Sequence, residues 1–314
     1  MPIQSKWQAL QTEAINPASV KLDTAPVADI IDLMISEDRK VISAVHRERE
    51  RIAHGVDIIT HALRKGGRLL FAGAGTSGRL GVVEAAEMPP TFGTPLSLVQ
   101  AVMAGGRDAM FQSREGVEDD YAAGIRALAR LHVSQKDVVV GVSASGMTPF
   151  VRGTFAKART AGAKIIFVTC CVTPELKTFV DLTIAPIVGP EVIAGSTRLK
   201  AGTATKLILN MLTTVAMVRT GKTYGNLMVD VQVASEKLRD RARRIVSVAT
   251  GLDYDEATKL LRRARDNVKV AIVMHKAQLS YAKATALLKE ANQSVRKAVG
   301  EDVEDRLKQV TDSA

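Results

Sequence analysis

The chain has 314 residues, 46% of them hydrophobic and 24% charged, so it is long enough to bury a sizeable core and to fold as a main domain with a smaller one. Its two cysteines, Cys170 and Cys171, are adjacent, which excludes a disulfide framework and argues against a metal site. The formal net charge of +10 suits anionic metabolites and also raises the question of nucleic-acid binding.

Positive charge is densest at residues 239–244 and 259–265, in helical sequence with few aromatic side chains to stack on bases. We interpret these stretches as solvent-exposed helix faces and expect no nucleic-acid partner. No continuous apolar stretch of roughly 18 residues occurs, and the opening MPIQSKWQ lacks the apolar core of a secretory signal. We therefore expect a cytoplasmic protein with no membrane segment.

Helical periodicity dominates residues 1–55, where apolar residues recur between positions 27 and 34 and again between 41 and 45. This spacing predicts two or three N-terminal helices. Pro26 suits the start of one of them.

From residue 68 onward, short apolar runs alternate with helical sequence. The runs lie at 69–72, 96–99, 138–142, 165–169 and 182–185. Runs rich in β-branched residues and separated by crossovers predict a parallel sheet covered on both faces. The predicted fold class is a doubly wound α/β domain.

A long helix is predicted from Lys200 to Arg219, ending near Gly221. Sequence of helical character resumes after residue 226, and residues 249–288 predict a small three-helix bundle with Asp253 or Asp255 as an N-cap. We therefore divide the chain into an N-terminal helical segment (1–55), the α/β domain (56–225) and a C-terminal helical region (226–314).

Two loops are suited to binding phosphate. Residues 73–78 (GAGTSG) follow the first predicted strand, and residues 143–148 (SASGMT) follow the third. Each leads into a helix N-terminus, where backbone N–H groups have no partner inside the helix. Together with the hydroxyls of both loops, these groups predict a site for one phosphate monoester.

The glycines at 73, 75 and 78 also match the GxGxxG pattern of dinucleotide-binding proteins. Such a site requires an acidic residue about 20 positions further on to hold the ribose. No acidic residue lies between the second predicted strand and Asp108. The hydroxyl-rich second loop would also have no role in that site, so we favour the phosphate monoester.

Six stretches are long enough to be specific: GAGTSGRLG (73–81), EAAEMPPTFG (84–93), EGVEDD (115–120), SASGMTPF (143–150), GPEVIAGSTRLKAGTA (189–204) and GNLMVD (225–230). They resemble the signature of the N-acetylmuramic acid 6-phosphate etherases, over nearly the whole chain. The resemblance implies a sugar isomerase domain with a five-stranded parallel sheet, and a homodimer whose active site lies close to the subunit contact.

The resemblance also implies the reaction. The ether joining D-lactate to the sugar is cleaved, giving N-acetylglucosamine 6-phosphate and D-lactate in cell-wall amino-sugar recycling, with no cofactor. In the open-chain sugar the ether oxygen lies β to an aldehyde, so the proton between them is acidic enough for elimination. A base and an acid with different pKa values suffice, and water then adds to the unsaturated aldehyde. This chemistry requires no metal.

By resemblance, Glu87 is the proton donor of the catalytic pair. It is followed by Pro89 and Pro90, which are predicted to end the helix and to point the Glu87 carboxyl into a cleft. Glu84 lies one helical turn earlier and is the main alternative to Glu87.

By the same resemblance, Glu118 is the second member of the pair and acts as the base. It lies in an acidic cluster with Glu115, Asp119 and Asp120, a pattern typical of a solvated helix face. The assignment of Glu118 therefore depends on the resemblance, and Asp119 is an alternative.

The predicted substrate-binding residues come from the two loops and from the start of the long helix. They are Gly75, Thr76, Ser77, Gly78, Arg79, Ser143, Ser145, Gly146, Thr148, Glu191, Ser196 and Lys200. Helix capping is an equally simple interpretation of residues 196–200. In the functional interpretation, Glu191 or Lys200 contacts sugar hydroxyls or the ring oxygen.

Two positions depart from many relatives: Met88 replaces a cysteine, and Met147 replaces an arginine, which removes one charge near the substrate. The five histidines show no metal-ligand spacing.

Two other functions stay open. One is a non-enzymatic sugar-phosphate sensor that binds a partner through its C-terminal helices. The other is an aldose–ketose phosphosugar isomerase, which needs no acid for a leaving group.

Overall fold

A computed structural model describes residues 10–146, 148–172, 178–233, 235–300, 303–304 and 307–308. The chain divides into two compact units. The first comprises Met1–Ala86 and Ser97–Thr213, and the second comprises Glu87–Leu96 and Thr214–Ala314. The short segment Glu87–Leu96 therefore clusters with the C-terminal region, although it continues a helix of the first unit. Met147, where the sequence departs from many relatives, lies outside the described residues.

The first unit is built on a parallel sheet. In the described residues it has five strands in the order β2-β1-β3-β4-β5. Their bounds are β1 Leu69–Gly73, β2 Val99–Met103, β3 Val138–Val142, β4 Lys164–Val168 and β5 Leu182–Ile184. All neighbouring pairs run parallel, which confirms the predicted doubly wound α/β class.

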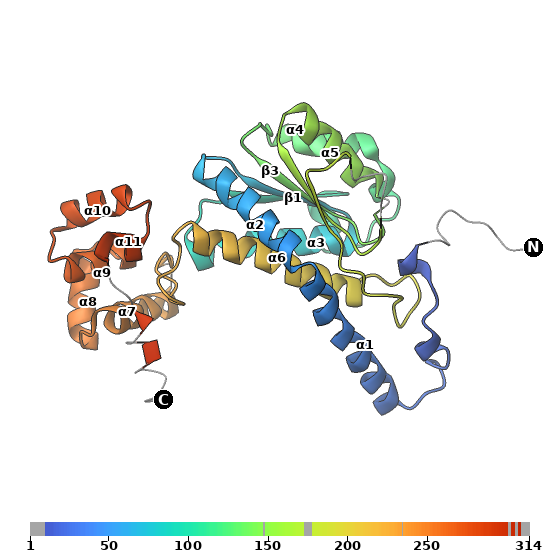
Figure 1. The fold of residues 1–314 in the computed structure, drawn as a ribbon, viewed down its shortest axis with the longest axis horizontal. Coiled ribbons are helices and arrows are strands. Elements are labelled where there is room, and N and C mark those ends of the chain that lie inside the picture. Colours follow the sequence, from blue (N-terminus) through green and yellow to red (C-terminus); the bar gives the residue numbers. More distant parts are fainter. Residues whose placement is uncertain are drawn as a thin grey trace, which may run out of the picture. The chain divides into compact units, whose positions relative to one another are not determined.

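Helices cover the sheet on both faces (Figure 1). The helices α4 (Tyr121–Arg130) and α5 (Pro149–Thr160) pack against each other on one face, while α2 (Arg49–Arg64) contacts β3 and β5 from the other. On the α5 face, the rings of Phe155 and Phe167 meet edge to face, with centroids 5.4 Å apart. Aromatic burial of this kind fixes α5, and hence the loop that precedes it, on the sheet.

The second strand lies further along the chain than the sequence predicted. Residues 96–98 form a turn, and β2 begins at Val99, so the predicted strand at 96–99 was wrong by three residues. Leu96, which suggested the earlier start, is 81% exposed. The middle residues of β2 are half-buried because it is an edge strand, and this weakens its apolar signal.

Two long helices continue from one unit into the other. Helix α3 spans Gly75–Phe92 and retains both prolines inside its last turns, so the prediction that Pro89 and Pro90 end the helix was wrong. Proline fixes φ near the helical value, and the missing N–H groups affect only the carbonyls one turn earlier. The helix instead ends at Gly93, whose φ of +60° is left-handed.

Helix α6 spans Lys200–Arg219, as predicted, and ends before Gly221, which has a φ of +80°. Among the described residues, α6 is the one helix long and apolar enough to cross a membrane by length and composition, and 56% of the window tested is buried inside the protein. A core helix has the same composition. We therefore interpret α6 as a core helix.

The second unit is helical in its described part. Its helices are α7 Glu236–Thr250, α8 Tyr254–Arg263, α9 Val268–Lys276, α10 Tyr281–Glu290 and α11 Val295–Val299. They enclose a core to which α9 contributes most of its length. Of the two predicted N-caps, Asp253 is the one used, because its carboxylate and the Glu256 side chain form a reciprocal capping box at the start of α8.

Candidate active site

The two predicted phosphate loops lie side by side at the carboxyl edge of the sheet. Strands β1 and β3 are neighbours, and Gly73 pairs with Val142 in their register. The loop after β1 turns at once into α3, and the loop after β3 leads into α5. A Cβ on Gly73 would lie 2.7 Å from the Gly78 nitrogen, so glycine is required for this tight turn. Two helix N-termini thus adjoin one space.

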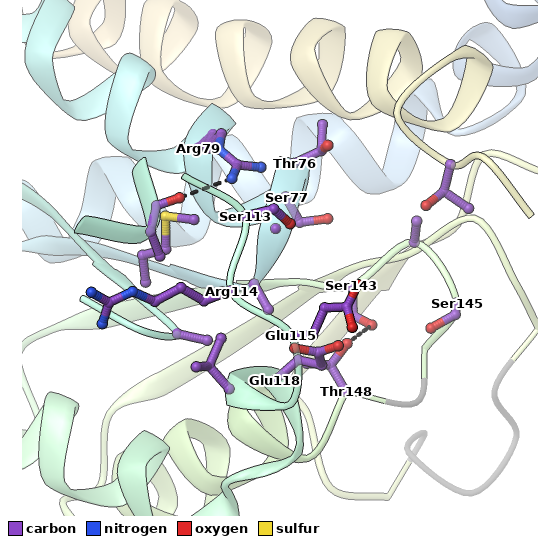
Figure 2. A pocket seen from close by; sticks show the side chains of 18 residues that line it. Thr76, Ser77, Arg79, Ser113, Arg114, Glu115, Glu118, Ser143, Ser145 and Thr148 are labelled. Atoms are coloured by element: carbon purple, nitrogen blue, oxygen red, sulfur yellow. Dashed lines mark hydrogen bonds between the residues drawn. The ribbon is translucent and has the colours of Figure 1, made fainter. Parts of the chain in front are cut away.

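That space is a cavity of about 240 Å³, shown in Figure 2. Its lining includes residues predicted from both loops together with one predicted catalytic carboxylate: Gly75, Thr76, Ser77, Arg79, Glu118, Ser143, Ser145 and Thr148. Hydroxyl groups, two helix N-termini and a carboxylate therefore line the same cavity. This combination is suited to an anionic substrate that also undergoes proton transfer.

The hydroxyls of the second loop are held in place. Ser143 Oγ and Thr148 Oγ1 lie 2.7 Å apart and share a hydrogen bond, whose donor is either group. Thr148 is also the residue before Pro149, the first residue of α5. The bond fixes the Ser143 and Thr148 hydroxyls relative to each other, so these two groups are preorganised for a ligand.

Arg79 lines the cavity, but its guanidinium already binds the protein. Its Nε donates to the Met110 carbonyl at 3.1 Å. Its Nη2 donates to the Ala109 carbonyl at 2.9 Å (Figure 2). These carbonyls belong to the short helix η3 (Arg107–Met110), which precedes the acidic cluster. Arg79 therefore ties the first turns of α3 to the segment that leads to Glu118.

The acidic residues at positions 118–120 have different environments. Glu118 lies in the short helix η4 (Val117–Asp119), is half-buried and lines the cavity. Asp119 is exposed and is not among the lining residues. Asp120 caps α4 by accepting from the Ala123 N–H at 2.7 Å, and this bond lowers the pKa of Asp120. Of these three carboxylates, Glu118 alone lines the cavity.

Sequence reasoning missed several lining residues. Ser113, Arg114 and Glu115 line the cavity from the segment before η4, and Thr197 lines it from the loop before α6. Figure 2 shows Glu115 close to Glu118. Glu115 lies outside η4, two residues before its start, so no helical spacing in the sequence marked it as a neighbour of Glu118.

The two glutamates of α3 differ in environment. Glu84 is 5% exposed and accepts hydrogen bonds from Asn210 Nδ2 and Thr213 Oγ1 of α6. Glu87 is exposed and is not among the residues that line the cavity. Glu84 therefore stabilises the packing of α3 on α6, whereas the Glu87 carboxyl is accessible to solvent.

Comparisons with known proteins identify the family of this chain. A model of the glucokinase regulatory protein N-terminal SIS domain matches residues 51–159. The N-acetylmuramic acid 6-phosphate etherase of Salinibacter ruber is 49% identical over 94% of this chain and 95% of its own length. That of Gloeobacter violaceus is 52% identical over 85% of this chain and 87% of its own length. This chain belongs to the N-acetylmuramic acid 6-phosphate etherase family.

A solved phosphoheptose isomerase from Francisella tularensis is also similar to part of this etherase-family chain. It is 18% identical, and the match covers 62% of this chain and 100% of the isomerase, with a TM-score of 0.49.

Glu191 and Lys200, both predicted substrate ligands of this etherase-family member, lie outside the main cavity. The Glu191 carboxylate accepts from the Lys200 N–H at 3.0 Å and from the Ala201 N–H at 2.9 Å, so it caps α6. Burial raises the pKa of Glu191, and these two bonds oppose the rise. The Lys200 ammonium lies 2.5 Å from Glu37 Oε2 of α1 (Val27–Arg47), and both side chains are almost fully buried.

Glu37 is held ionised by two lysines. Burial alone would raise its pKa, but hydrogen bonds from Lys200 and Lys40 outweigh that effect and lower it. The loop from Glu191 to Lys200 carries Thr197 to the main cavity. These bonds support a role for Glu191 and Lys200 in fixing the loop that carries Thr197. A direct contact of either residue with the sugar stays a prediction.

Three other predicted ligands do not line the cavity. Gly78 and Gly146 lie within the two loops, and Ser196 is half-buried one residue before Thr197. Among the described residues, no group of three or more histidine, cysteine or acidic side chains is placed to hold a metal ion. Both cysteines are free and buried, and burial raises the pKa of Cys170 to about 12, so it is unsuited to act as a nucleophile.

Proposed function

We propose that this protein cleaves the lactyl ether of N-acetylmuramic acid 6-phosphate to give N-acetylglucosamine 6-phosphate and D-lactate. The observation that carries the proposal is the identity of 49% to a named etherase over 94% of the chain. The cavity supports it, because hydroxyl-rich loops and a carboxylate line the same space. The relatives are named as etherases, so they favour neither the sugar-phosphate sensor nor the phosphosugar isomerase.

The phosphate group is bound at the two loops. Thr76 and Ser77 lie in the first turn of α3, and Ser143, Ser145 and Thr148 lie just before α5. Hydroxyls and N–H groups at helix N-termini stabilise a dianion without a dedicated lysine. A sugar anchored there extends along the cavity towards Glu118.

The reaction begins in the open-chain sugar. Glu118 removes the proton from the carbon beside the aldehyde, and the electron pair forms a carbon–carbon double bond as the bond to the lactate oxygen breaks. A protonated carboxyl gives its proton to that oxygen, so D-lactate leaves. Water then adds to the unsaturated aldehyde at the carbon that carried the lactate oxygen, and the carbon beside the aldehyde takes up a proton, so the two carboxyl groups exchange roles.

Glu87 supplies the proton in this proposal. The assignment rests on its match to the family motif, and its exposed position supports it because the carboxyl is available to a substrate. Glu84, the alternative on the same helix, is buried against Asn210 and Thr213. Glu118 is favoured over Asp119 as the base because Glu118 lines the cavity and Asp119 does not.

The enzyme is proposed to be a homodimer, with its active site close to the subunit contact. Helix α1 supports this, since it carries a row of exposed apolar side chains: Val27, Ile31, Met34, Ile35 and Ile42. Such a row on one helix is typical of a protein interface. Ile31→Asp is expected to shift the sedimentation coefficient from dimer to monomer, and a wild-type value that is already monomeric would refute the dimer.

We also propose a cytoplasmic location and a role in recycling cell-wall amino sugars. Two free, buried cysteines are compatible with a reducing compartment.

An enzyme-coupled assay for D-lactate tests the proposed function. The purified protein is expected to release D-lactate from N-acetylmuramic acid 6-phosphate, with N-acetylglucosamine 6-phosphate as the second product. Binding of the substrate without lactate release would support the sensor. Conversion to an isomer without lactate would support the isomerase, and either result would overturn the etherase proposal.

A further inference from the structure

Three charged side chains meet inside the second unit, where the proposed mechanism gives them no role. Lys269, in the first turn of α9, is 3% exposed, and its ammonium lies 2.6 Å from Asp230 Oδ2. Lys222 reaches the same oxygen at 3.0 Å. Burial lowers the pKa of Lys269, and Asp230 opposes that shift. Burying a lysine is costly, and a buried ion pair often adds little net stability, so stability alone does not account for this cluster.

Asp230 also contacts the end of α3. The Asp230 carbonyl oxygen lies so close to Gly93 that a Cβ at Gly93 would come within 2.3 Å of it. Gly93 directly follows the last residue of α3 and donates its N–H to the Pro89 carbonyl at 2.9 Å. The segment Glu87–Leu96 belongs to the second unit, and Glu87 is its first residue.

The position of Lys269 is set by the core of the helical bundle. Its neighbours in α9, Val268 and Val270, are buried in the core of the bundle, so the backbone at Lys269 cannot move independently of that core. The bundle is thus linked to α3 by three successive contacts. Lys269 pairs with the Asp230 carboxylate, the Asp230 carbonyl packs against Gly93, and the Gly93 N–H bonds to the Pro89 carbonyl in the last turns of α3.

We propose that Lys269 is a positioning residue for Glu87, and that the C-terminal bundle serves catalysis by holding the end of α3. The inference rests on the proposed function, because it requires Glu87 to take part in the reaction. Lys269 is not among the residues that line the cavity. It acts through Asp230 and Gly93, so its loss should affect turnover rather than binding of the phosphate.

The test compares Lys269→Met with Lys259→Met, a matched change at an exposed position of α8. Steady-state kinetics are measured per folded molecule, with the folded fraction taken from thermal unfolding. For Lys269→Met we expect kcat to fall about tenfold, since a misplacement of about 1 Å can cost about 10²-fold and this change acts through two intervening residues. The KM is expected to stay within about twofold, because the hydroxyl loops of the first unit are untouched. Lys259→Met should match the wild type.

Two further variants keep the test decisive. Lys269→Arg keeps the charge and is expected to restore most of the kcat. Gly93→Ala leaves the charges intact but places a Cβ against the Asp230 carbonyl, so it should lower kcat without changing KM. Amide hydrogen exchange of residues 87–96 should increase in Lys269→Met and Gly93→Ala, while exchange at residues 73–78 stays unchanged.

Glu87→Gln serves as the reference. If Glu87→Gln is inactive while Lys269→Met and Gly93→Ala retain wild-type kcat per folded molecule, the positioning role is overturned and the proposed function stands. If Glu87→Gln is fully active, the proposed role of Glu87 fails, and the positioning role fails with it. A fall in kcat for Lys269→Met, absent in Lys259→Met and reversed in Lys269→Arg, supports the inference.

Discussion

The two ends of helix α3 serve different regions of the molecule. Its first turn follows β1 through a glycine-rich loop and lines the cavity with Thr76 and Ser77. Its last turns carry Glu87 and end at Gly93, against the Asp230 carbonyl of the second unit. In the proposed mechanism, the first end binds the phosphate and the second supplies the proton. Affinity and turnover should therefore respond to different mutations.

The largest effect is expected for the two glutamates. Glu118→Gln and Glu87→Gln each remove a proton-transferring group with little change in shape. We expect kcat to fall by roughly 10²–10⁴, the usual contribution of a general acid or base, with KM little changed. Lactate release under saturating substrate is the measurement. Glu84→Gln is the informative comparison, because it should lower stability more than kcat per folded molecule.

A glutamate variant that retained wild-type turnover would remove that residue from the mechanism. Turnover that survived in Glu118→Gln but not in a Glu115→Gln variant would move the base to Glu115, the other glutamate lining the cavity.

The next effect concerns stability in the first unit. Lys200→Met leaves Glu37 buried without its main partner, and removing one member of a buried ion pair costs roughly 3–5 kcal/mol. Lys206→Met, at an exposed position of the same helix, should cost little. Chemical unfolding measures both. The double variant Glu37→Gln/Lys200→Met should be more stable than Lys200→Met alone, and equal stability would argue against the pair.

The same pair predicts a dependence on pH. The pKa of Glu37 is lowered in the folded protein from its ordinary value of 4.5, so its contribution to stability is present above that value and is lost as the pH falls through the folded pKa. Unfolding measured between neutral and acid pH should therefore lose less stability in Glu37→Gln than in the wild type. An identical acid limb in both proteins would contradict this account.

The smallest effect is expected at the phosphate loops. Ser77→Ala and Ser145→Ala each remove one hydroxyl, and a hydrogen bond to a charged group contributes about 1.5–3 kcal/mol, so each KM should rise roughly tenfold or more. The kcat should change little. Ser97→Ala, at an exposed position outside the cavity, is the control. An equal loss for the unphosphorylated sugar would contradict the phosphate role of these serines.

Much of the fold was predictable because its signals are local. The run at Val138–Val142 is buried along its whole length, so its apolar pattern marked β3 correctly. The edge strand β2 was misplaced because its middle residues are half-buried, and the exposed Leu96 mimicked core sequence. Pro89 and Pro90 led to a wrong helix end for a similar reason. The rule that proline ends a helix is local, whereas α3 continues to Phe92 and Gly93 then packs against the Asp230 carbonyl.

The site was less predictable because it depends on residues far apart in the chain. The two hydroxyl loops were found, since strand ends and helix starts are visible in sequence. Thr197 and Glu115 were missed because only the folded chain brings them to the cavity. The partner of Lys200 is Glu37, 163 residues away, and no local pattern joins them.

The central claim is that Glu118 removes the proton beside the aldehyde of a sugar anchored by the hydroxyl loops. The direct measurement is the reaction in D2O, with the product examined by mass spectrometry and NMR. The wild type is expected to give N-acetylglucosamine 6-phosphate carrying deuterium at the carbon beside the aldehyde, and Glu118→Gln should show neither this exchange nor lactate release. Product without deuterium at that carbon, or undiminished exchange in Glu118→Gln, would contradict the account.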